Sequence, residues 1–311
     1  MYLKMDAETG FALGGNKVRK LEYELAPHRL DGVTHLITAG GPQSNHCRVT
    51  AAAAARLGLG CVLVTQAPEP DVPTGNALLH RLFGAEIVTV EERDQRAPGM
   101  ETAAARIRAT GGQPLVVPIG ASTGLGCLGY ARAACELTRQ LDELADGCPK
   151  TTLFLSSSSG GTLAGLVLGL ALLGRDDVHL VAVSADAPAD ELRDTALSLA
   201  AEGLDLLGSG RPRDRGSGAG PVPEDVALTA IDLDAIDLHV DDGQVGDGYG
   251  VPTRASTRAL ERFARSEGVV LDPTYTAKAA AGLVAHLESE GVPDSTRVVF
   301  LHTGGAPGLL A

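Results

Sequence analysis

Short apolar runs alternate with longer segments of helical periodicity along most of the chain. The runs are apolar at consecutive positions, which is typical of strands buried on both faces of a parallel sheet. Many of the 39 glycines punctuate these runs, so each run is predicted to be a separate strand. The predicted strands are residues 34–38, 61–65, 86–90, 115–117, 152–155, 178–184, 269–271 and 298–302.

The segments between these strands have the apolar spacing of helices. Helices are predicted at residues 44–57, 76–83, 101–109 and 125–144, and others are predicted to start at Leu21, Thr162 and Tyr275. Strands that alternate with helices form parallel units, so the pattern predicts an open α/β architecture with helices on both faces of its sheets. Ligands bind such folds at the carboxyl ends of the strands. Residues 203–224 are rich in glycine and proline, and we expect a mobile loop there.

Composition sets limits on the partners of this chain. Its 311 residues are enough for two domains or one large one, and with 44% hydrophobic residues and no Trp the core is built from Ala, Val and Leu. The net charge of −13 argues against nucleic acid as a partner. An anionic ligand therefore needs a local cluster of positive charge.

The cysteines and the hydropathy pattern indicate a compartment. The five cysteines are odd in number and scattered, so neither a disulfide framework nor a metal site is expected. No apolar run reaches membrane-spanning length, and the N-terminus lacks a signal-peptide pattern. We therefore expect a cytoplasmic protein that binds no membrane. The cysteines are Cys47, Cys61, Cys127, Cys135 and Cys148.

The stretch 14–22 holds the first candidate chemistry. Two glycines precede Lys17 and Lys20, with Arg19 between the lysines, and a helical pattern follows. Free backbone N–H groups at a helix start favour an anion, and a lysine held there can form an imine if it is pushed toward the neutral amine. A turn followed by a surface cluster of basic residues fits the same stretch.

Four further motifs follow predicted strands. In residues 40–46, Ser44 and Asn45 can cap a helix or bind an anion. In residues 156–162, hydroxyls and glycines can cradle a phosphate, although the spacing is neither that of a Walker loop nor that of a dinucleotide fingerprint. The others are residues 272–278 and 302–305. Taken singly, these motifs also fit a helix cap, a tight turn, a core tyrosine and a satisfied histidine.

Together, and with Gly248-Tyr249-Gly250, the motifs resemble in order those of one family of pyridoxal-phosphate enzymes, the 1-aminocyclopropane-1-carboxylate (ACC) deaminase and D-cysteine desulfhydrase family. The resemblance implies fold type II, similar to the tryptophan synthase β subunit, with two open parallel-sheet domains. A small α/β domain of residues 20–128 would be inserted into a large domain of residues 1–19 and 129–311. Pyridoxal 5'-phosphate would lie between them, and homodimers are usual in the family.

The resemblance implies roles for individual residues. Lys17 would form the Schiff base with the cofactor, Asn45 would bind the pyridoxal 3-hydroxyl, and Lys20 would help to hold the phosphate. Tyr275 would flank the pyridine ring and act in catalysis. The remaining cofactor-binding residues would be Ser159, Gly160, Gly161 and Thr162 at the phosphate, with Thr276 and Thr303 near the pyridine nitrogen.

The substrate side is implied in the same way. Ser44 would lie beside the substrate carboxylate and Cα, with a role in catalysis, and Asn45, His46 and Tyr249 would line the substrate side. The sequence departs from the family where the usual Lys-Arg-Asp-Asp reads Lys-Met-Asp-Ala at residues 4–7, and where Ser158 replaces a common glycine. A few tens of residues that usually precede this stretch are missing, so we expect either a misassigned start or a truncated first strand.

Three positions distinguish members of the family. ACC deaminases resemble one another in having glutamate after the catalytic tyrosine, leucine after the later histidine, and glutamine after Ser-Asn. This chain has Thr276, Thr303 and His46, which are the desulfhydrase-like residues. The resemblance therefore favours a carbon–sulfur lyase that converts D-cysteine or a related amino acid to pyruvate, ammonia and sulfide. The alternatives are ACC deaminase, L-cysteate sulfo-lyase, and a nucleotide- or cofactor-binding α/β protein without turnover.

Overall fold

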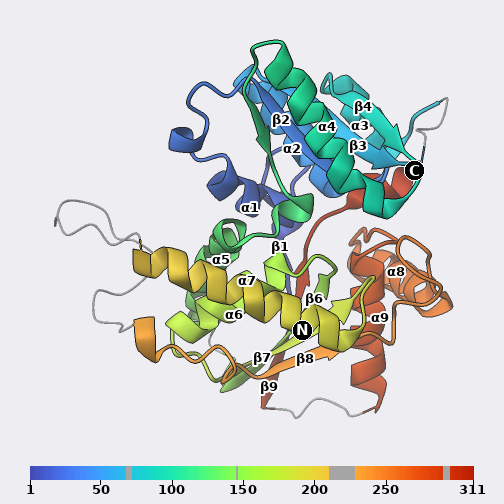
Figure 1. Ribbon diagram of the computed structural model, residues 1–311. Helices are drawn as coiled ribbons and strands as arrows, with labels where there is room; N and C mark the ends of the chain where they lie inside the picture. Colours follow the sequence, from blue (N-terminus) through green and yellow to red (C-terminus); the bar gives the residue numbers. More distant parts are fainter. Residues whose placement is uncertain (68–71, 145, 210–227, 290–294) are drawn as a thin grey trace.

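Two separate parallel sheets form the framework of the molecule (Figure 1). The computed structural model describes residues 1–67, 72–144, 146–209, 228–289 and 295–311. The larger sheet has the strand order β1-β9-β6-β7-β8 and the smaller one β4-β3-β2-β5, and neighbouring strands pair in parallel. The strands are β1 (Tyr2–Met5), β2 (His35–Gly40), β3 (Gly60–Gln66), β4 (Glu86–Val90), β5 (Pro114–Val116), β6 (Lys150–Ser157), β7 (Val178–Ser184), β8 (Leu238–Asp241) and β9 (Thr296–His302).

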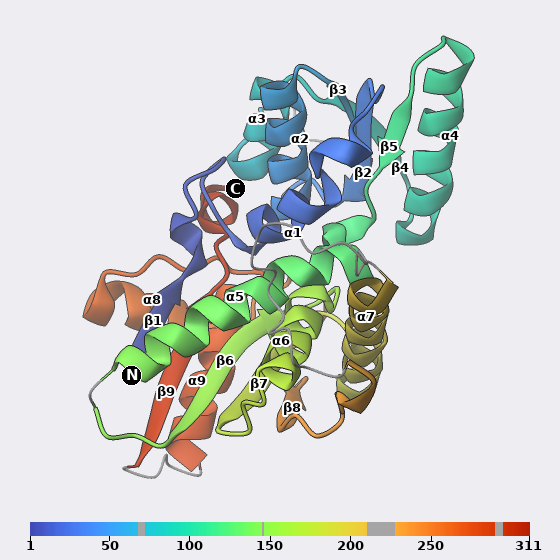
Figure 2. The same cartoon turned by 90° about the vertical axis from the view of Figure 1, so that its left-hand side faces the viewer.

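Helices cover both faces of each sheet, which confirms the predicted fold class (Figure 2). Because successive strand residues point to opposite faces, continuous apolar runs are needed to fill both. In β2, Ile37 packs toward α4 while Leu36 packs toward α2. The helices are α1 (Asn16–Glu24), α2 (Asn45–Leu57), α3 (Gly75–Leu82), α4 (Arg96–Ala109), α5 (Gly124–Glu143), α6 (Gly161–Leu172), α7 (Ala189–Ser209), α8 (Arg254–Glu267) and α9 (Thr276–Ser289).

The larger sheet follows the same rule. Leu153 and Leu155 of β6 belong to the core formed with α5, α6 and α7, whereas Phe154 between them belongs to the core formed with α8 and α9. Short 3-10 turns complete the fold at Asp6–Glu8, Pro27–Arg29, Arg93–Gln95, Ile119–Ala121, Leu228–Ala230 and Ala306–Leu310. The boundaries of the two domains, placed at residues 20 and 128, stay a prediction; they fall inside α1 and α5.

Two predictions of local structure are wrong. Residues 269–271 form no strand: Leu271 is buried against α8 and α9, and Val269 donates its N–H to the Phe263 carbonyl at 3.4 Å, so this apolar run closes a helix end. Residues 203–209 of the expected loop belong to α7, and the rest of that loop lies outside the described residues.

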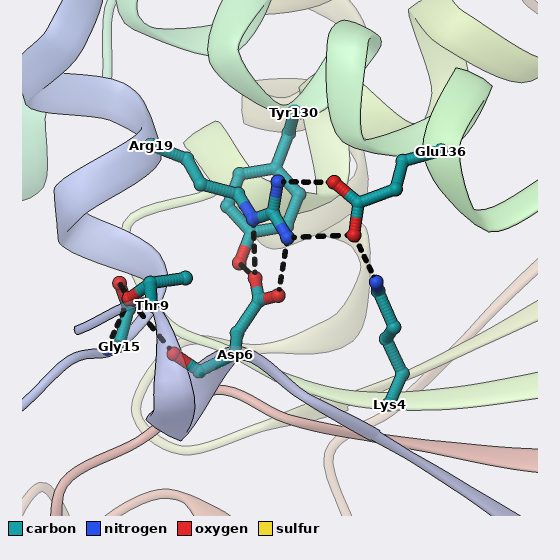
Figure 3. A network of polar contacts seen from close by, with 7 residues as sticks. All are labelled: Lys4, Asp6, Thr9, Gly15, Arg19, Tyr130 and Glu136. Carbon is teal, nitrogen blue, oxygen red and sulfur yellow. Dashed lines mark hydrogen bonds and ion pairs between the residues drawn. The ribbon is translucent and has the colours of Figure 1, made fainter.

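A charged network holds the N-terminal strand against α1 and α5 (Figure 3). The carboxylate of buried Asp6 accepts two bonds from Arg19, at 2.9 and 3.0 Å, and one from the Tyr130 hydroxyl. Arg19 also pairs with Glu136 at 3.0 Å, and Glu136 pairs with Lys4. The Lys-Met-Asp-Ala sequence thus keeps a carboxylate that ties the first strand to the start of α1.

Candidate active site

A cavity of about 250 Å³ lies where strands of both sheets end. Most of its walls come from turns that directly follow a strand, as expected for an open α/β fold. It brings together eleven of the residues singled out from the sequence, from positions far apart in the chain. They are Lys17, Lys20, Ser44, Asn45, His46, Ser159, Gly160, Thr162, Tyr249, Tyr275 and Thr303.

The glycine turn before α1 delivers Lys17 to this cavity. Gly14 has φ +67°, and a Cβ there would lie 1.9 Å from the Ala7 carbonyl oxygen, so a side chain cannot be accommodated. The turn is fixed by the Asn16 N–H, which donates to the Thr303 carbonyl at 2.9 Å. Lys17 is half-buried, and its Nζ donates to Asn16 Oδ1 at 3.1 Å.

Burial lowers the pKa of Lys17 to about 8, with a further contribution from the charge of Arg48 and an opposing one from Asp272. At pH 7 roughly a tenth of this side chain is therefore the neutral amine, far more than for an ordinary lysine. The neutral amine is the form that attacks a carbonyl carbon, so Lys17 has the property that imine chemistry requires.

Lys20 and two turns that carry hydroxyls and glycines form an anion cradle. Lys20 is 1% exposed and donates to Ser122 Oγ at 3.2 Å. Ser122 Oγ also lies 2.8 Å from Ser159 Oγ and accepts the Gly161 N–H at 3.3 Å. Burial, reinforced by the nearby charge of Lys17, holds the pKa of Lys20 well below its usual range. A bound anion would stabilise the charged form of this lysine.

The backbone around the cradle suits a phosphate. Gly160 has φ +76° and is the N-cap of α6, which has no side-chain cap. A Cβ on Gly120 would lie 2.4 Å from Ser159 Oγ, and one on Gly161 would lie 2.7 Å from Ser122 Oγ. A helix start without a side-chain cap, next to a buried ammonium, has the donors that a phosphate group needs. With Lys17 in the same cavity, the residues present fit a cofactor that has one aldehyde and one phosphate.

Residues at the start of α2 form another wall of the cavity. Ser44 is the N-cap, and its Oγ accepts the Cys47 N–H at 3.2 Å. Asn45 accepts hydrogen bonds at Oδ1 from Arg48 and Asn76, at 3.0 and 2.9 Å. His46 is buried, and burial together with Lys17 and Lys20 lowers its pKa well below the usual range, so it is a neutral imidazole.

Two tyrosines lie at the far side of the cavity. The hydroxyls of Tyr249 and Tyr275 are hydrogen-bonded, and their rings meet edge to face with centroids 5.9 Å apart. Burial and the neighbouring Tyr249 raise the pKa of Tyr275 well above its usual range, so its hydroxyl stays protonated. The turn before Tyr249 is held by buried Lys278, which donates to the Val245 and Gly248 carbonyls at 2.7 and 3.0 Å.

The comparisons with known proteins agree with this site. Residues 1–304 match the family described as pyridoxal-phosphate dependent enzyme. The chain belongs to this family. The expected cofactor is therefore confirmed, and Lys17 and the Lys20 cradle are the groups of this chain that would hold its aldehyde and its phosphate.

Individual relatives indicate which members of the pyridoxal-phosphate dependent enzymes this chain is similar to. The chain is 37% identical over 316 residues to proteins named D-cysteine desulfhydrase from Salmonella typhi and Salmonella newport, which covers all of this chain and 88% of each relative. A solved structure titled as an ACC deaminase homologue superposes with a TM-score of 0.81 at 31% identity, over 99% of this chain and 85% of that one. An L-serine ammonia-lyase from Rhizomucor miehei, at 17% identity and a TM-score of 0.64, shares the fold.

Two residues expected in the cofactor site of this pyridoxal-phosphate dependent enzyme do not line the cavity. Thr276 is fully buried, and its hydroxyl donates to Asp272 Oδ1 at 2.7 Å. Gly161 lies behind Ser122, which it contacts through its N–H. Thr303 does line the cavity, where its hydroxyl meets Ser156 Oγ at 3.1 Å.

Sequence reasoning missed several residues of the site. Asp186 follows β7, so the rule that ligands bind at strand ends identifies it in retrospect. Arg93 comes from a turn after β4, donates to both oxygens of Asp186 and lies over the Tyr249 ring, 5.2 Å from its centroid. Nothing in the sequence pairs two residues 93 positions apart. Asn16, Ser122 and Arg96 were missed as well.

Two findings concern other classes of site. Within the described ranges, no group of three or more His, Cys, Asp or Glu side chains is arranged to hold a metal ion. In the same ranges, no helix is both long and apolar enough to span a bilayer.

Proposed function

We propose that this chain is a carbon–sulfur lyase that converts D-cysteine, or a closely related amino acid, to pyruvate, ammonia and sulfide. The observation that carries the proposal is the chemistry of the cavity wall. Among the described residues that line it, Asp186 is the one carboxylate, and it is bound by Arg93. The cavity-lining hydroxyls that meet at the ends of β6 and β9 are those of Ser156 and Thr303, and both are neutral.

A wall without a free carboxylate favours elimination over ring opening. The bound cofactor supplies an electron sink, and its strength increases when a carboxylate supports a protonated ring nitrogen. Neutral hydroxyls leave that nitrogen less protonated. Loss of a good leaving group from the β carbon tolerates the weaker sink, whereas opening a three-membered carbon ring is more demanding.

Lys17 and Tyr275 are the candidates for proton transfer. Lys17, with its pKa lowered to about 8, is suited to accept the Cα proton. Tyr275 remains protonated, so its hydroxyl is suited to donate a proton to the departing sulfur. The sulfur leaves with the bonding electrons, and the released 2-aminoacrylate reacts with one water to give pyruvate and ammonia. Ser44, at the start of α2, would hold the substrate carboxylate through its hydroxyl and the free N–H groups there.

A substrate panel tests the proposal. The holoenzyme is incubated with D-cysteine, L-cysteine, L-cysteate and ACC, and pyruvate, 2-oxobutanoate, sulfide and sulfite are measured. We expect pyruvate and sulfide in equal amounts from D-cysteine, with Lys17→Ala as the inactive control. The likeness to the ACC deaminase homologue makes that reaction the second candidate. Efficient 2-oxobutanoate formation without sulfide from either cysteine would establish the deaminase, and sulfite from L-cysteate would establish the sulfo-lyase.

A further inference from the structure

Arg48 is a buried charge without a carboxylate partner among the described residues. It lies in α2 between apolar neighbours and is 0% exposed. Its guanidinium donates to three neutral oxygens: Gly14 O at 2.7 Å, Asn45 Oδ1 at 3.0 Å and Asn76 Oδ1 at 3.1 Å. Its Nε has no hydrogen-bond partner within the described ranges. Burying a charge is costly unless it is paired, so this arrangement calls for an explanation beyond stability.

The guanidinium determines which way the amide of Asn45 points. Arginine carries donors only, so the atom of Asn45 that faces it must be the oxygen. Asn76 donates to the same oxygen at 2.9 Å, and Asn76 is itself fixed by Gln43, whose backbone carbonyl accepts its amide at 2.8 Å. Arg48 and Asn76 therefore both donate hydrogen bonds to the side-chain oxygen of Asn45. The amide nitrogen of Asn45 is left as a donor toward the cavity that this residue lines.

Arg48 also acts on the lysine. Its bond to Gly14 O holds the glycine turn that precedes Lys17, although Arg48 does not itself line the cavity. The charged and titratable groups around Lys17 are Arg48 from α2, Asp272 from the turn before α9, Lys20 one helical turn along α1, and His46. Arg48 lowers the pKa of Lys17 in addition to burial, and Asp272 opposes it.

We propose that Arg48 is a positioning residue with two separable effects on the cofactor site: its forked guanidinium directs the N–H of Asn45 toward the cofactor, and its charge, held at the glycine turn that precedes Lys17, disfavours a second cation there. The donor from Asn45 suits an ionised ring oxygen on the cofactor, which accepts hydrogen bonds and cannot donate them. The inference rests on the cofactor and holds whichever amino acid is the substrate.

Two substitutions separate the effects. Arg48→Lys keeps the charge and loses the fork, while Arg48→Met loses both. The first readout uses cofactor-free protein: the rate at which acetic anhydride acetylates Lys17 is followed against pH by peptide mass spectrometry. We expect a midpoint near pH 8 for the wild type and for Arg48→Lys. Arg48→Met should move the midpoint upward by about one pH unit, because a like charge has been removed.

The second readout is cofactor affinity, measured by visible absorbance during titration with pyridoxal 5'-phosphate. Both variants should bind it more weakly by about 10- to 100-fold, because neither a lysine nor a methionine side chain reproduces the forked guanidinium that holds Asn45. Arg297→Met is the matched control: Arg297 is also buried and pairs with Asp146, away from the cavity, so its loss lowers stability without either effect.

A third substitution tests the electrostatic effect even if Arg48→Met does not fold. Asn76→Asp keeps Arg48 in place and sets a carboxylate against it at the 3.1 Å contact, which neutralises its charge. The midpoint for Lys17 should again move upward. Unchanged midpoints in Arg48→Met or Asn76→Asp would overturn the electrostatic effect. Wild-type cofactor affinity in Arg48→Lys would overturn the positioning of Asn45. A residue that served only to stabilise the fold would change the unfolding midpoint and neither readout.

Discussion

At the scale of single residues, Ser122 tests the phosphate cradle. Its hydroxyl contacts Lys20, Ser159 and the Gly161 N–H, so Ser122→Ala removes the one atom that joins three parts of the cradle. We expect about tenfold weaker binding of pyridoxal 5'-phosphate, since a bond with a charged donor is lost. Ser266→Ala, on the exposed side of α8, is the control. Equal affinity in both variants would remove Ser122 from the cradle.

Thr276 gives a second prediction at this scale. Its hydroxyl donates to Asp272, and the Asp272 N–H donates back to it at 2.7 Å, so the side chain closes the turn that carries Tyr275. Thr276→Glu would set a second carboxylate against Asp272 in a fully buried place. We expect a loss of roughly 2–4 kcal/mol in the free energy of unfolding in urea, because like charges are buried together. Thr303→Leu, the other deaminase-like change, should cost less.

The same measurements bear on reaction choice. If Thr276→Glu folds with wild-type stability and forms 2-oxobutanoate from ACC, its carboxylate faces the cofactor and the residue controls the reaction as the resemblance implies. If stability falls and 2-oxobutanoate does not appear, the residue acts through the turn.

At the scale of elements, the Asp6 network joins β1, α1 and α5. Asp6→Ala leaves the Arg19 guanidinium with Glu136 alone and the buried Tyr130 hydroxyl without its acceptor. Breaking a buried pair by removing one partner costs about 3–5 kcal/mol, and we expect this loss in the free energy of unfolding. The exposed pair of Arg106 and Glu86 is the control, where Glu86→Ala should cost less than about 1 kcal/mol. Equal losses would contradict a structural role for the network.

The elements that sequence predicts well are those buried on both faces. The consecutive apolar residues of β2, β3, β6, β7 and β9 fill two cores each, so the pattern is strong. The edge strands β1 and β8 are four residues long and partly exposed, and their patterns are too weak to detect. Helix α8 is also missing from the prediction, although its capping box at Thr253 and its amphipathic pattern, with Ala259 and Phe263 buried, are both visible in the sequence. The apolar run at residues 269–271 was predicted to be a strand because an apolar run alone does not distinguish a buried strand from a buried connection between helices.

At the scale of the whole molecule, the site depends on contacts that no local pattern encodes. The glycine turns and strand-end motifs predicted Lys17, Lys20, Asn45 and the residues of the phosphate loop because each needs a special local conformation. Arg48 reaches Gly14 and Asn76 across the fold, and its role follows from the donor-only chemistry of its side chain. In the sequence, a residue such as Arg48 is visible only as a charged position in an otherwise apolar helix, and the sequence does not indicate which groups it contacts.

The ion pair of Arg93 and Asp186 links the two sheets at the cavity. Arg93 follows β4 of the smaller sheet and Asp186 follows β7 of the larger, and their closest contact is 2.6 Å. Because the Arg93 side chain is 48% exposed, the pair should contribute less than about 1 kcal/mol to the free energy of unfolding. Its larger effect should be on substrate binding, since Arg93 also covers the ring of Tyr249, which contacts Tyr275.

We therefore expect Arg93→Gln and Asp186→Asn each to raise KM for D-cysteine several-fold with little change in the urea midpoint. The double variant should resemble either single one, because the second change removes no further contact between the sheets. Added salt should raise the wild-type KM toward the variant values, since the Debye length falls from about 8 Å at physiological ionic strength to about 3 Å at 1 M and an exposed ion pair then weakens. Additive effects of the two changes, together with a KM that salt leaves unchanged, would show that the two residues act on the substrate separately.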